Sequence, residues 1–356
     1  QEANSLTIQD SQLEDLSALN NVNVYNSLDL TLNGANDISG LEDVNRVDNF
    51  EINSQSATQI SGFNDLIENL GDGFVLNTPN LKTITGLDSF TKSTYFRLQS
   101  DAMTELSGLN AYKIVTEGDL LIDTPNLETI SGLNALNSVS GDVLIQSDEI
   151  TDLSGLVELN YVGGDFLLND REFTSLNGLY DLNSVEGDLS FANNNIDDVT
   201  ALSRLYYVGG KFDLSNNELT NLDGLDTLNN VDNGFDLSDN NLQDIDGISN
   251  LGSVTNDIDF RNNALTNIDG LSGLRNVNGS IYLNNNPNLT DISGLKTLIG
   301  IDEGESIYFD AGITEREGFV GLPADAWLCY SSKAVFIENN GNLQDDLCEE
   351  ETENKE

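Results

Sequence analysis

A short alternation of apolar and polar residues recurs along almost the whole chain. The stretch from Gly210 to Gly224 reads G-K-F-D-L-S-N-N-E-L-T-N-L-D-G, and it contains the pattern L-x-L-x-x-N-x-L as Phe212, Leu214, Asn217 and Leu219. Side chains in an extended strand point alternately to opposite faces, so the first two of these residues share one face. The pattern returns in the next two stretches, which start at Phe235 and Ile258.

The repeat has a nearly constant period. A small residue before a Leu, Phe or Ile marks each copy, and the step from one copy to the next is 22 to 24 residues. A repeat of this length predicts a solenoid, which grows by stacking copies and does not split into globular domains. The anchors are Ala18, Gly40, Gly62, Gly86, Gly108, Gly132, Gly155, Gly178, Ala201, Gly224, Gly247, Gly270 and Gly294.

Each copy contributes one predicted strand. Two apolar residues, separated by one residue, are expected to face the core, and the residue between them is expected to face outward. The chain therefore predicts fourteen short strands. Their apolar pairs are Leu6/Ile8, Leu28/Leu30, Phe50/Ile52, Phe74/Leu76, Phe96/Leu98, Leu120/Ile122, Val143/Ile145, Phe166/Leu168, Leu189/Phe191, Phe212/Leu214, Phe235/Leu237, Ile258/Phe260, Ile281/Leu283 and Ile307/Phe309.

The segment after each strand predicts a short helical turn. In the copy from Ser131 to Val139, apolar residues recur at steps of three, which indicates one helical or 3₁₀ turn laid against the core. Ser131, Asp223 and Asp246 are expected to cap such turns. The Gly or Ala anchor is expected to allow close approach of the backbone.

An Asn recurs at the bend that follows the strand. Its buried amide is expected to donate to and accept from the main chain of neighbouring bends. Several middle copies depart from this pattern, with Pro79, Asp101, Pro125, Asp148 and Arg171 in the same slot. The recurring residues are Asn33, Asn194, Asn217, Asn240, Asn263 and Asn286.

These motifs resemble leucine-rich-repeat proteins over roughly residues 5 to 314. Copies such as Asn193 to Leu205 are similar to the short repeats of bacterial internalins, and the G-D-L elements also resemble receptor L-domain repeats. The resemblance implies an α/β solenoid, a right-handed horseshoe with a parallel sheet on its concave face and helical or 3₁₀ turns on its convex side. It also implies that the concave face binds a protein or a glycan.

The repeat pattern divides the chain into three parts. Residues 1–310 are the expected solenoid, residues 311–348 are expected to cap its last core layer, and the acidic residues 349–356 are expected to be disordered. Cys329 and Cys348 are the two cysteines of the chain, and both lie in the cap. They are expected to form one disulfide of an exported protein, and the alternative is two reduced thiols in the cytosol.

Composition and charge narrow the range of expected partners and cellular locations. The formal net charge of −47 disfavours nucleic acid and anionic lipid as partners, and it suits high ionic strength. No apolar run approaches the length of about 18 residues that predicts a membrane span. The chain starts at Gln1, which we interpret as a trimmed chain whose export signal is gone. We therefore expect an extracellular or cell-surface location and no membrane insertion.

Catalysis is not expected. The chain contains no histidine, so it has no histidine base and no Ser-His-Asp triad. It also lacks the G-x-x-x-x-G-K-[ST] phosphate loop and the G-x-S-x-G nucleophile motif. With 61 acidic residues, the proximity of two carboxylates carries no information about acid–base chemistry. We predict that the protein is not an enzyme.

The outward residues of the strands form candidate binding columns, because neighbouring strands lie about 4.8 Å apart. One column is apolar, two are acidic and a pair of tyrosines follows. Stacked carboxylates repel, so we expect relief from salt, a basic partner or a hard cation such as Ca²⁺, or hydrogen bonds to the preceding turn; no cofactor or metal-loop motif is otherwise expected. The candidates are Leu121, Leu144 and Leu167; Asp119, Asp142, Asp165 and Asp188; Asp213, Asp236 and Asp259; and Tyr282 and Tyr308.

These features predict a surface-exposed binding module. Contiguous exposed apolar surface usually marks an interaction site. The acidic columns favour a protein or glycan partner that is basic or bridged by a cation. The alternative is a structural spacer or surface-coat segment of a larger adhesin-like protein.

Overall fold

The structure is a computed structural model of the 356-residue chain. It describes residues 2–10, 12–14, 16–19, 21–168, 173–298, 300–301, 306–309, 335–338 and 341–342. The chain forms two compact units, residues 1–187 and residues 188–356. We call them unit 1 and unit 2 and describe each separately.

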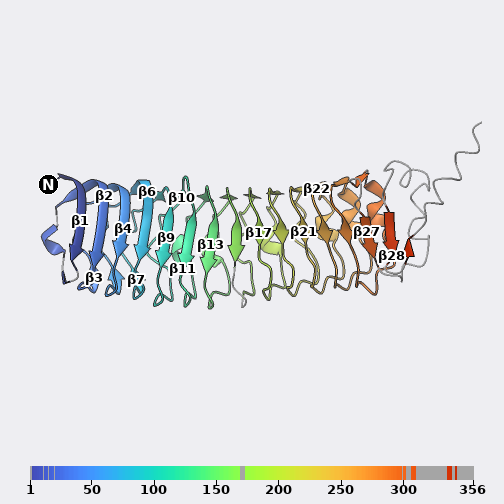
Figure 1. Ribbon diagram of the computed structural model, residues 1–356, viewed down its shortest axis with the longest axis horizontal. Helices are drawn as coiled ribbons and strands as arrows, with labels where there is room; N and C mark the ends of the chain where they lie inside the picture. Colours follow the sequence, from blue (N-terminus) through green and yellow to red (C-terminus); the bar gives the residue numbers. More distant parts are fainter. Residues whose placement is uncertain are drawn as a thin grey trace, which may run out of the picture. The chain divides into compact units, whose positions relative to one another are not determined.

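Unit 1 is a parallel β-solenoid built on one main ladder of strands. Successive strands pair in parallel, one per repeat, and Figure 1 shows them as blue to green arrows lying side by side. The ladder consists of β1 (Glu2–Asp10), β2 (Asn23–Leu32), β4 (Arg46–Asn53), β6 (Glu68–Asn77), β9 (Phe96–Gln99), β11 (Leu120–Asp123), β13 (Val143–Gln146) and β15 (Phe166–Leu168).

Two smaller sets of strands complete unit 1. The long strand β6 pairs with both β8 and β9, so a second ladder of two-residue strands branches from it. This ladder consists of β8 (Lys92–Ser93), β10 (Ile114–Val115), β12 (Ser138–Val139), β14 (Tyr161–Val162) and β16 (Ser184–Val185). A separate three-stranded sheet contains β3 (Asp37–Ile38), β5 (Gln59–Ile60) and β7 (Thr83–Ile84), and the 3₁₀ turns are η1 (Ser17–Leu19), η2 (Ser131–Leu133) and η3 (Ser154–Leu156).

Unit 2 has the same architecture with shorter strands. Its main ladder is β17 (Leu189–Ser190), β19 (Phe212–Asp213), β21 (Phe235–Asp236), β23 (Ile258–Asp259), β25 (Ile281–Tyr282), β27 (Ser306–Phe309) and β28 (Val335–Glu338), with β29 (Gly341–Asn342) antiparallel to β28. Its second ladder is β18 (Tyr207–Val208), β20 (Asn230–Val231), β22 (Ser253–Val254), β24 (Asn276–Val277) and β26 (Gly300–Ile301). The 3₁₀ turns are η4 (Thr200–Leu202), η5 (Asp246–Ile248), η6 (Asp269–Gly273) and η7 (Ser293–Thr297).

The structure confirms the fourteen predicted strands. Each predicted position carries a strand of a main ladder, from β1 to β27. The residues of the apolar pairs from Leu28/Leu30 to Ile281/Leu283 are at most 3% exposed. Leu6 and Ile8 of β1 are only half-buried, because β1 pairs with β2 alone at the end of its ladder. Strand β28 continues the ladder into the segment predicted as a cap.

Core side chains stack along the solenoid because the register aligns equivalent positions. Phe50, Phe74 and Phe96 are paired in register, and their rings lie 4.1 Å and 5.5 Å apart, centroid to centroid, in nearly parallel planes. Phe212 and Phe235 of unit 2 repeat the arrangement at 5.1 Å. Stacked aromatic pairs add about 0.5–1.5 kcal/mol beyond the burial of their surface, so a register slip would cost both terms.

The helical part of the prediction is only partly right. Throughout the described residues, the helical turns are 3₁₀ and three to five residues long, so the α/β character of the sequence prediction reduces to short turns. The horseshoe curvature and right-handed winding stay predictions.

The predicted helix caps are wrong. Ser131 and Asp246 are the first residues of η2 and η5, and the caps are Ile130 and Ile245, which make no side-chain cap bond. In several other copies, the side chain two residues before the turn accepts the exposed N–H. Asp152 accepts from Ser154 at 2.8 Å, and equivalent acceptors are Asp198, Asn221, Asn267 and Asp291.

A ladder of buried Asn side chains supports the bends of unit 2, as predicted. Asn217 Nδ2 donates to Leu214 O at 3.1 Å and to Phe191 O of the preceding repeat at 3.0 Å. Its Oδ1 accepts the Ile196 N–H at 3.0 Å. Each amide therefore satisfies main-chain groups of two repeats at a bend that hides them from water. Asn240, Asn263 and Asn286 make the equivalent bonds.

Unit 1 supports its bends differently, which the sequence pattern did not predict. Asn33 is exposed and follows the buried Leu32. In the later repeats of unit 1 the residue one position before the Asn slot is a buried Ser or Thr, namely Ser54, Thr78, Ser100, Thr124 and Ser147. Ser100 Oγ donates to Leu81 O, and Ser147 Oγ donates to Leu127 O, both at 2.7 Å. In unit 2 the equivalent earlier position has a positive φ, as in Asn216 at 55°, so the buried position moves to the next residue.

The glycine anchors allow the predicted close approach. A Cβ on Gly270 would lie 1.7 Å from Ile245 O of the preceding repeat, which no side chain can occupy. Stacking at this distance therefore selects glycine.

Several sequence predictions lie outside the described residues. These are Arg171, the Cys329–Cys348 bridge and the tail from residue 349 to residue 356. Within the described part of the chain, no helix is long and apolar enough to cross a membrane.

Replacing Asn240 with Ala should destabilise unit 2. The substitution leaves the Leu219 N–H and the carbonyls of Leu214 and Leu237 without their amide partner. Unsatisfied buried groups cost about 1–3 kcal/mol each, so we expect a loss of about 3 kcal/mol in the free energy of unfolding. Urea titration measures it. Asn241→Ala, at the exposed neighbouring position, is the control, and equal losses in the two variants would contradict the ladder.

Candidate functional site

The outward face of the unit 1 ladder presents one residue per strand in a continuous column. Thr7 of β1 lies in register with Asp29 of β2, and the pairing continues strand by strand to the end of the ladder. The column changes from polar to apolar along its length, because its remaining members are Glu51, Val75, Arg97, Leu121, Leu144 and Leu167.

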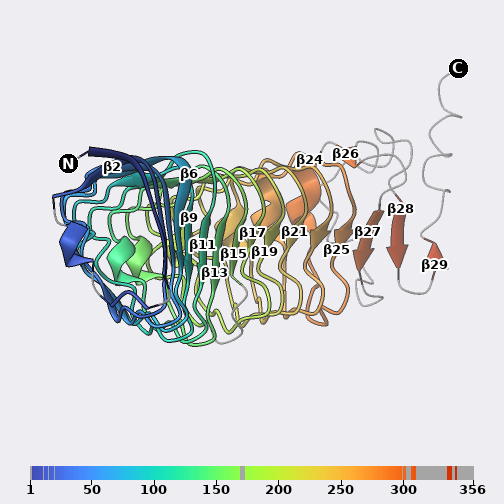
Figure 2. The same cartoon turned by 60° about the vertical axis from the view of Figure 1, so that its left-hand side comes forward.

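The three predicted leucines form the apolar end of this column. Leu121 of β11 pairs with Leu144 of β13, which pairs with Leu167 of β15. All three side chains are half-buried, and the strands that carry them lie side by side in Figure 2. The core residues on either side of each leucine are buried, so the leucines are fixed to a rigid surface. The structure therefore brings the predicted apolar column together.

The predicted aspartate column of unit 1 has a main-chain role. Asp119 Oδ1 accepts the Asp142 N–H at 2.9 Å, and Asp142 Oδ1 accepts the Asp165 N–H at 2.8 Å. A Cβ on Gly141 or Gly164 would lie within 2.3 Å of the preceding carboxylate, which explains the G-D sequence. Hydrogen bonding to the neighbouring turn, one of the alternatives from the sequence, therefore occurs.

The same bond recurs in unit 2 with different residues. Asp188 Oδ1 accepts the Lys211 N–H at 2.6 Å, and Asp257 Oδ1 accepts the Ser280 N–H at 2.8 Å. Sequence reasoning missed Asp257, although it lies in the same slot of its repeat, directly before the apolar strand pair.

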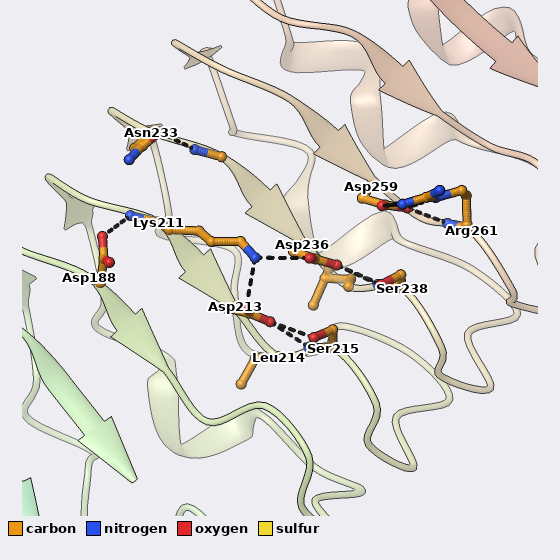
Figure 3. Close-up of polar contacts among 12 residues, drawn as sticks. Asp188, Lys211, Asp213, Leu214, Ser215, Asn233, Asp236, Ser238, Asp259 and Arg261 are labelled. Atoms are coloured by element: carbon orange, nitrogen blue, oxygen red, sulfur yellow. Dashed lines mark hydrogen bonds and ion pairs between the residues drawn. The ribbon is translucent and has the colours of Figure 1, made fainter. Parts of the chain in front are cut away.

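The second acidic column lies on unit 2, and basic side chains of the same unit partly neutralise it. Lys211 Nζ lies 2.7 Å from Asp213 Oδ2 and 2.9 Å from Asp236 Oδ2, as Figure 3 shows. Each carboxylate also accepts two bonds through Oδ1, Asp213 from the N–H and Oγ–H of Ser215 and Asp236 from those of Ser238. The expected repulsion between these aspartates is relieved by a lysine of the protein itself.

The third aspartate of that column pairs with an arginine. Arg261 Nε lies 3.0 Å and 2.9 Å from the two carboxylate oxygens of Asp259, whose residue is 8% exposed. A carboxylate buried to this extent needs such a partner. The guanidinium carbon also lies 5.0 Å from the ring centroid of Tyr282, a cation–π contact.

Tyr282 and Tyr308 continue the stack beyond the arginine. Their rings are nearly parallel, at 4°, with centroids 4.9 Å apart. The two predicted tyrosines therefore stack on each other in register.

The pKa values follow these contacts. Burial alone would lower the pKa of Lys211, but hydrogen bonds and the charges of Asp213 and Asp236 raise it. Burial opposes ionisation of Asp236, yet hydrogen bonds from Ser238 and Lys211 lower its pKa. The hydrogen bonds that Arg261 donates to the Asp259 carboxylate raise the pKa of Arg261. All three groups are therefore held in their charged forms.

Sequence reasoning missed Lys211 and Arg261, although weak signals existed. Lys211 occupies the slot that holds aspartate in four earlier repeats, and Arg261 lies two residues after Asp259, where unit 2 elsewhere carries Ser215 and Ser238. Among the described residues, no group of three or more acidic, cysteine or histidine side chains is arranged to hold a metal ion.

Comparison with known proteins finds 25 chains of solved structures that are similar to this chain. No family model matches the chain, and no curated protein matches it. Its structure is similar to a crystal structure of an internalin from Listeria monocytogenes, with 18% sequence identity and a TM-score of 0.41, over 95% of this chain and 87% of the other.

Replacing Lys211 with Met should destabilise unit 2 more at pH 7 than at pH 3. The variant loses hydrogen bonds to two carboxylates that are 15% and 20% exposed, so we expect it to be about 1–2 kcal/mol less stable at pH 7. Because the folded pKa of Asp236 is lowered, its contribution is present above about pH 4 and is lost as the pH falls through the folded value.

The loss relative to wild type should therefore shrink at pH 3. Urea titrations at pH 7 and pH 3 measure it. Arg275→Met is the control, because it removes one positive charge from an exposed site of the same unit. The same loss at both pH values, or an equal loss in the control, would contradict this account of the Lys211 pairs.

Proposed function

We propose that this protein is a non-enzymatic binding module, exported to the extracellular space or the cell surface, that recognises a protein partner through the outward face of its strand ladder. The proposed contact surface in unit 1 is the leucine column of Leu121, Leu144 and Leu167. The observation that carries the proposal is the register of β11, β13 and β15, which stacks three half-buried leucines on one rigid face.

The column is well suited to a partner. Outward positions of a sheet in water are usually polar, and the earlier members of this column include Asp29 and Glu51. Three consecutive leucines depart from that rule at a cost in solvation that folding does not require, since the core lies on the opposite face. Fixed apolar groups also lose little conformational entropy on binding.

Charge supports a basic partner for the same surface. The chain carries 61 acidic and 14 basic residues. Asp119, Asp142 and Asp165 each precede one strand of the leucine column. Two of them use Oδ1 for the main chain, so Oδ2 is the acceptor that they offer to a Lys or Arg of the partner. Such charges speed association and select partners more than they add affinity.

Replacing the three leucines with Asp should abolish capture of the partner. Truncation of central apolar contacts commonly costs more than 1 kcal/mol each, so we expect the affinity to fall by at least about tenfold. Affinity capture from the native surface, followed by binding measurements on the captured protein, tests this. Circular dichroism and thermal unfolding check that the variant is folded.

A matched control uses the same three repeats. It introduces the same new carboxylates at exposed, equivalent positions, each directly after the leucine that follows a glycine anchor. The substitutions are Asn134→Asp, Val157→Asp and Tyr180→Asp. This control should bind as the wild type does. If the leucine variant is folded and still captures the same partner, or if nothing specific is captured, the alternative of a structural spacer is favoured.

A further inference from the structure

A hollow of about 320 Å³ opens on unit 2 above Gly234. Polar side chains of four consecutive repeats line it, and Figure 3 shows Lys211, Asp236 and Arg261 among them. Its volume falls at the lower end of the range for small-ligand pockets, about 300–1,000 Å³. The lining includes Lys211, Asn233, Asp236, Asn256, Arg261 and Tyr282.

The hollow exists because one repeat lacks a side chain. The slot before each strand pair holds Asp188, Lys211, Gly234, Asp257 and Ser280 in successive repeats of unit 2. A Cβ on Gly234 would meet nothing closer than Asp257 O at 3.4 Å and Lys211 Cγ at 3.8 Å. Neither contact forbids a side chain, so packing within the fold does not account for the glycine.

Four of the five charged side chains that line the hollow are paired with one another. Lys211 binds Asp236, and Arg261 binds Asp259 through both carboxylate oxygens. A cationic ligand could reach Asp257 without displacing these cations, but it would lie beside two positively charged side chains. An anionic ligand would meet three acidic side chains, the third being Asp257, against two basic ones. The pairing therefore favours an uncharged ligand.

The remaining hydrogen-bonding capacity alternates between donors and acceptors. The ammonium of Lys211 has three N–H groups and the guanidinium of Arg261 has five, more than their carboxylate partners use. Asn233 accepts from Asn256 Nδ2 at 3.0 Å, so its own Nδ2 can donate. Asp257 uses Oδ1 for the Ser280 N–H, so Oδ2 is the acceptor that it offers.

We propose that this hollow binds a neutral saccharide. Each hydroxyl of a sugar both donates and accepts hydrogen bonds, which matches the mixed lining of the hollow. The paired charges hold their donors in place before the ligand arrives, which lowers the entropic cost of binding. This site rests on unit 2 alone and does not depend on the function proposed for unit 1.

Gly234→Asp tests the site with little risk to folding. The new carboxylate fills the hollow, and its slot is the one in which Asp188 accepts the N–H of the next repeat. The control is Gly252→Asp, which adds the same charge to unit 2 outside the hollow, where a Cβ would lie 3.6 Å from Asn229 O. The probes are a microarray of neutral, sialylated and sulfated oligosaccharides with a set of basic peptides, all in EDTA.

The wild type should bind neutral oligosaccharides, and Gly234→Asp should weaken the best of them by at least tenfold in calorimetry. The Gly252→Asp control should stay within twofold of wild type. If Gly234→Asp unfolds at a lower temperature than the control, Asn256→Ala replaces it, and a loss of at least threefold is expected. No neutral ligand on the array, a preference for sulfated glycans or basic peptides, or unchanged binding in the hollow variants would overturn the proposal.

Discussion

The bend that follows each strand is the constraint on which the rest of the structure depends. In the described bends, main-chain N–H and C=O groups are hidden from water, and the cost of leaving them without partners would grow with each added copy. Asn217 and its equivalents form hydrogen bonds to these main-chain groups in unit 2, and Ser100 and Ser147 do so in unit 1. Each of these side chains bonds to the preceding repeat, so the ladder also fixes the register of the strands.

A fixed register turns single residues into columns. Because every repeat places its outward residue next to the one before it, three leucines become an apolar stripe and three aspartates become a concentration of charge. The protein treats the two differently. Lys211 and Arg261 partly neutralise the aspartate column of unit 2, whereas the register places one leucine beside the next in unit 1. For this reason we propose the leucines as an interaction surface of unit 1 and the charged pairs as a rigid, preorganised surface of unit 2.

The sequence predicted those parts of the structure that depend on local pattern. The strand pairs could be assigned because alternation over three residues decides which side chains face the core. The buried Asn of unit 2 followed from its spacing. The equivalent position in unit 1 did not, because it depends on whether the preceding residue adopts a positive φ, as Asn216 does. The caps failed for a similar reason, since the bonding atom lies two residues before Ser154 and not next to it. Lys211 could not be placed from sequence, because its pairing depends on a side-chain conformation that reaches a repeat 25 residues away.

A photocrosslinking residue placed on the outward face tests the central claim most directly. Benzoylphenylalanine at Leu144, in the middle of the leucine column, is compared with the same residue at Val157. Val157 is an exposed residue directly after the 3₁₀ turn η3 of the same repeat. Illumination with the captured partner should give a covalent adduct from position 144 and none from position 157. An adduct from position 157 alone, or equal adducts from both, would contradict the assignment of the strand face as the binding surface.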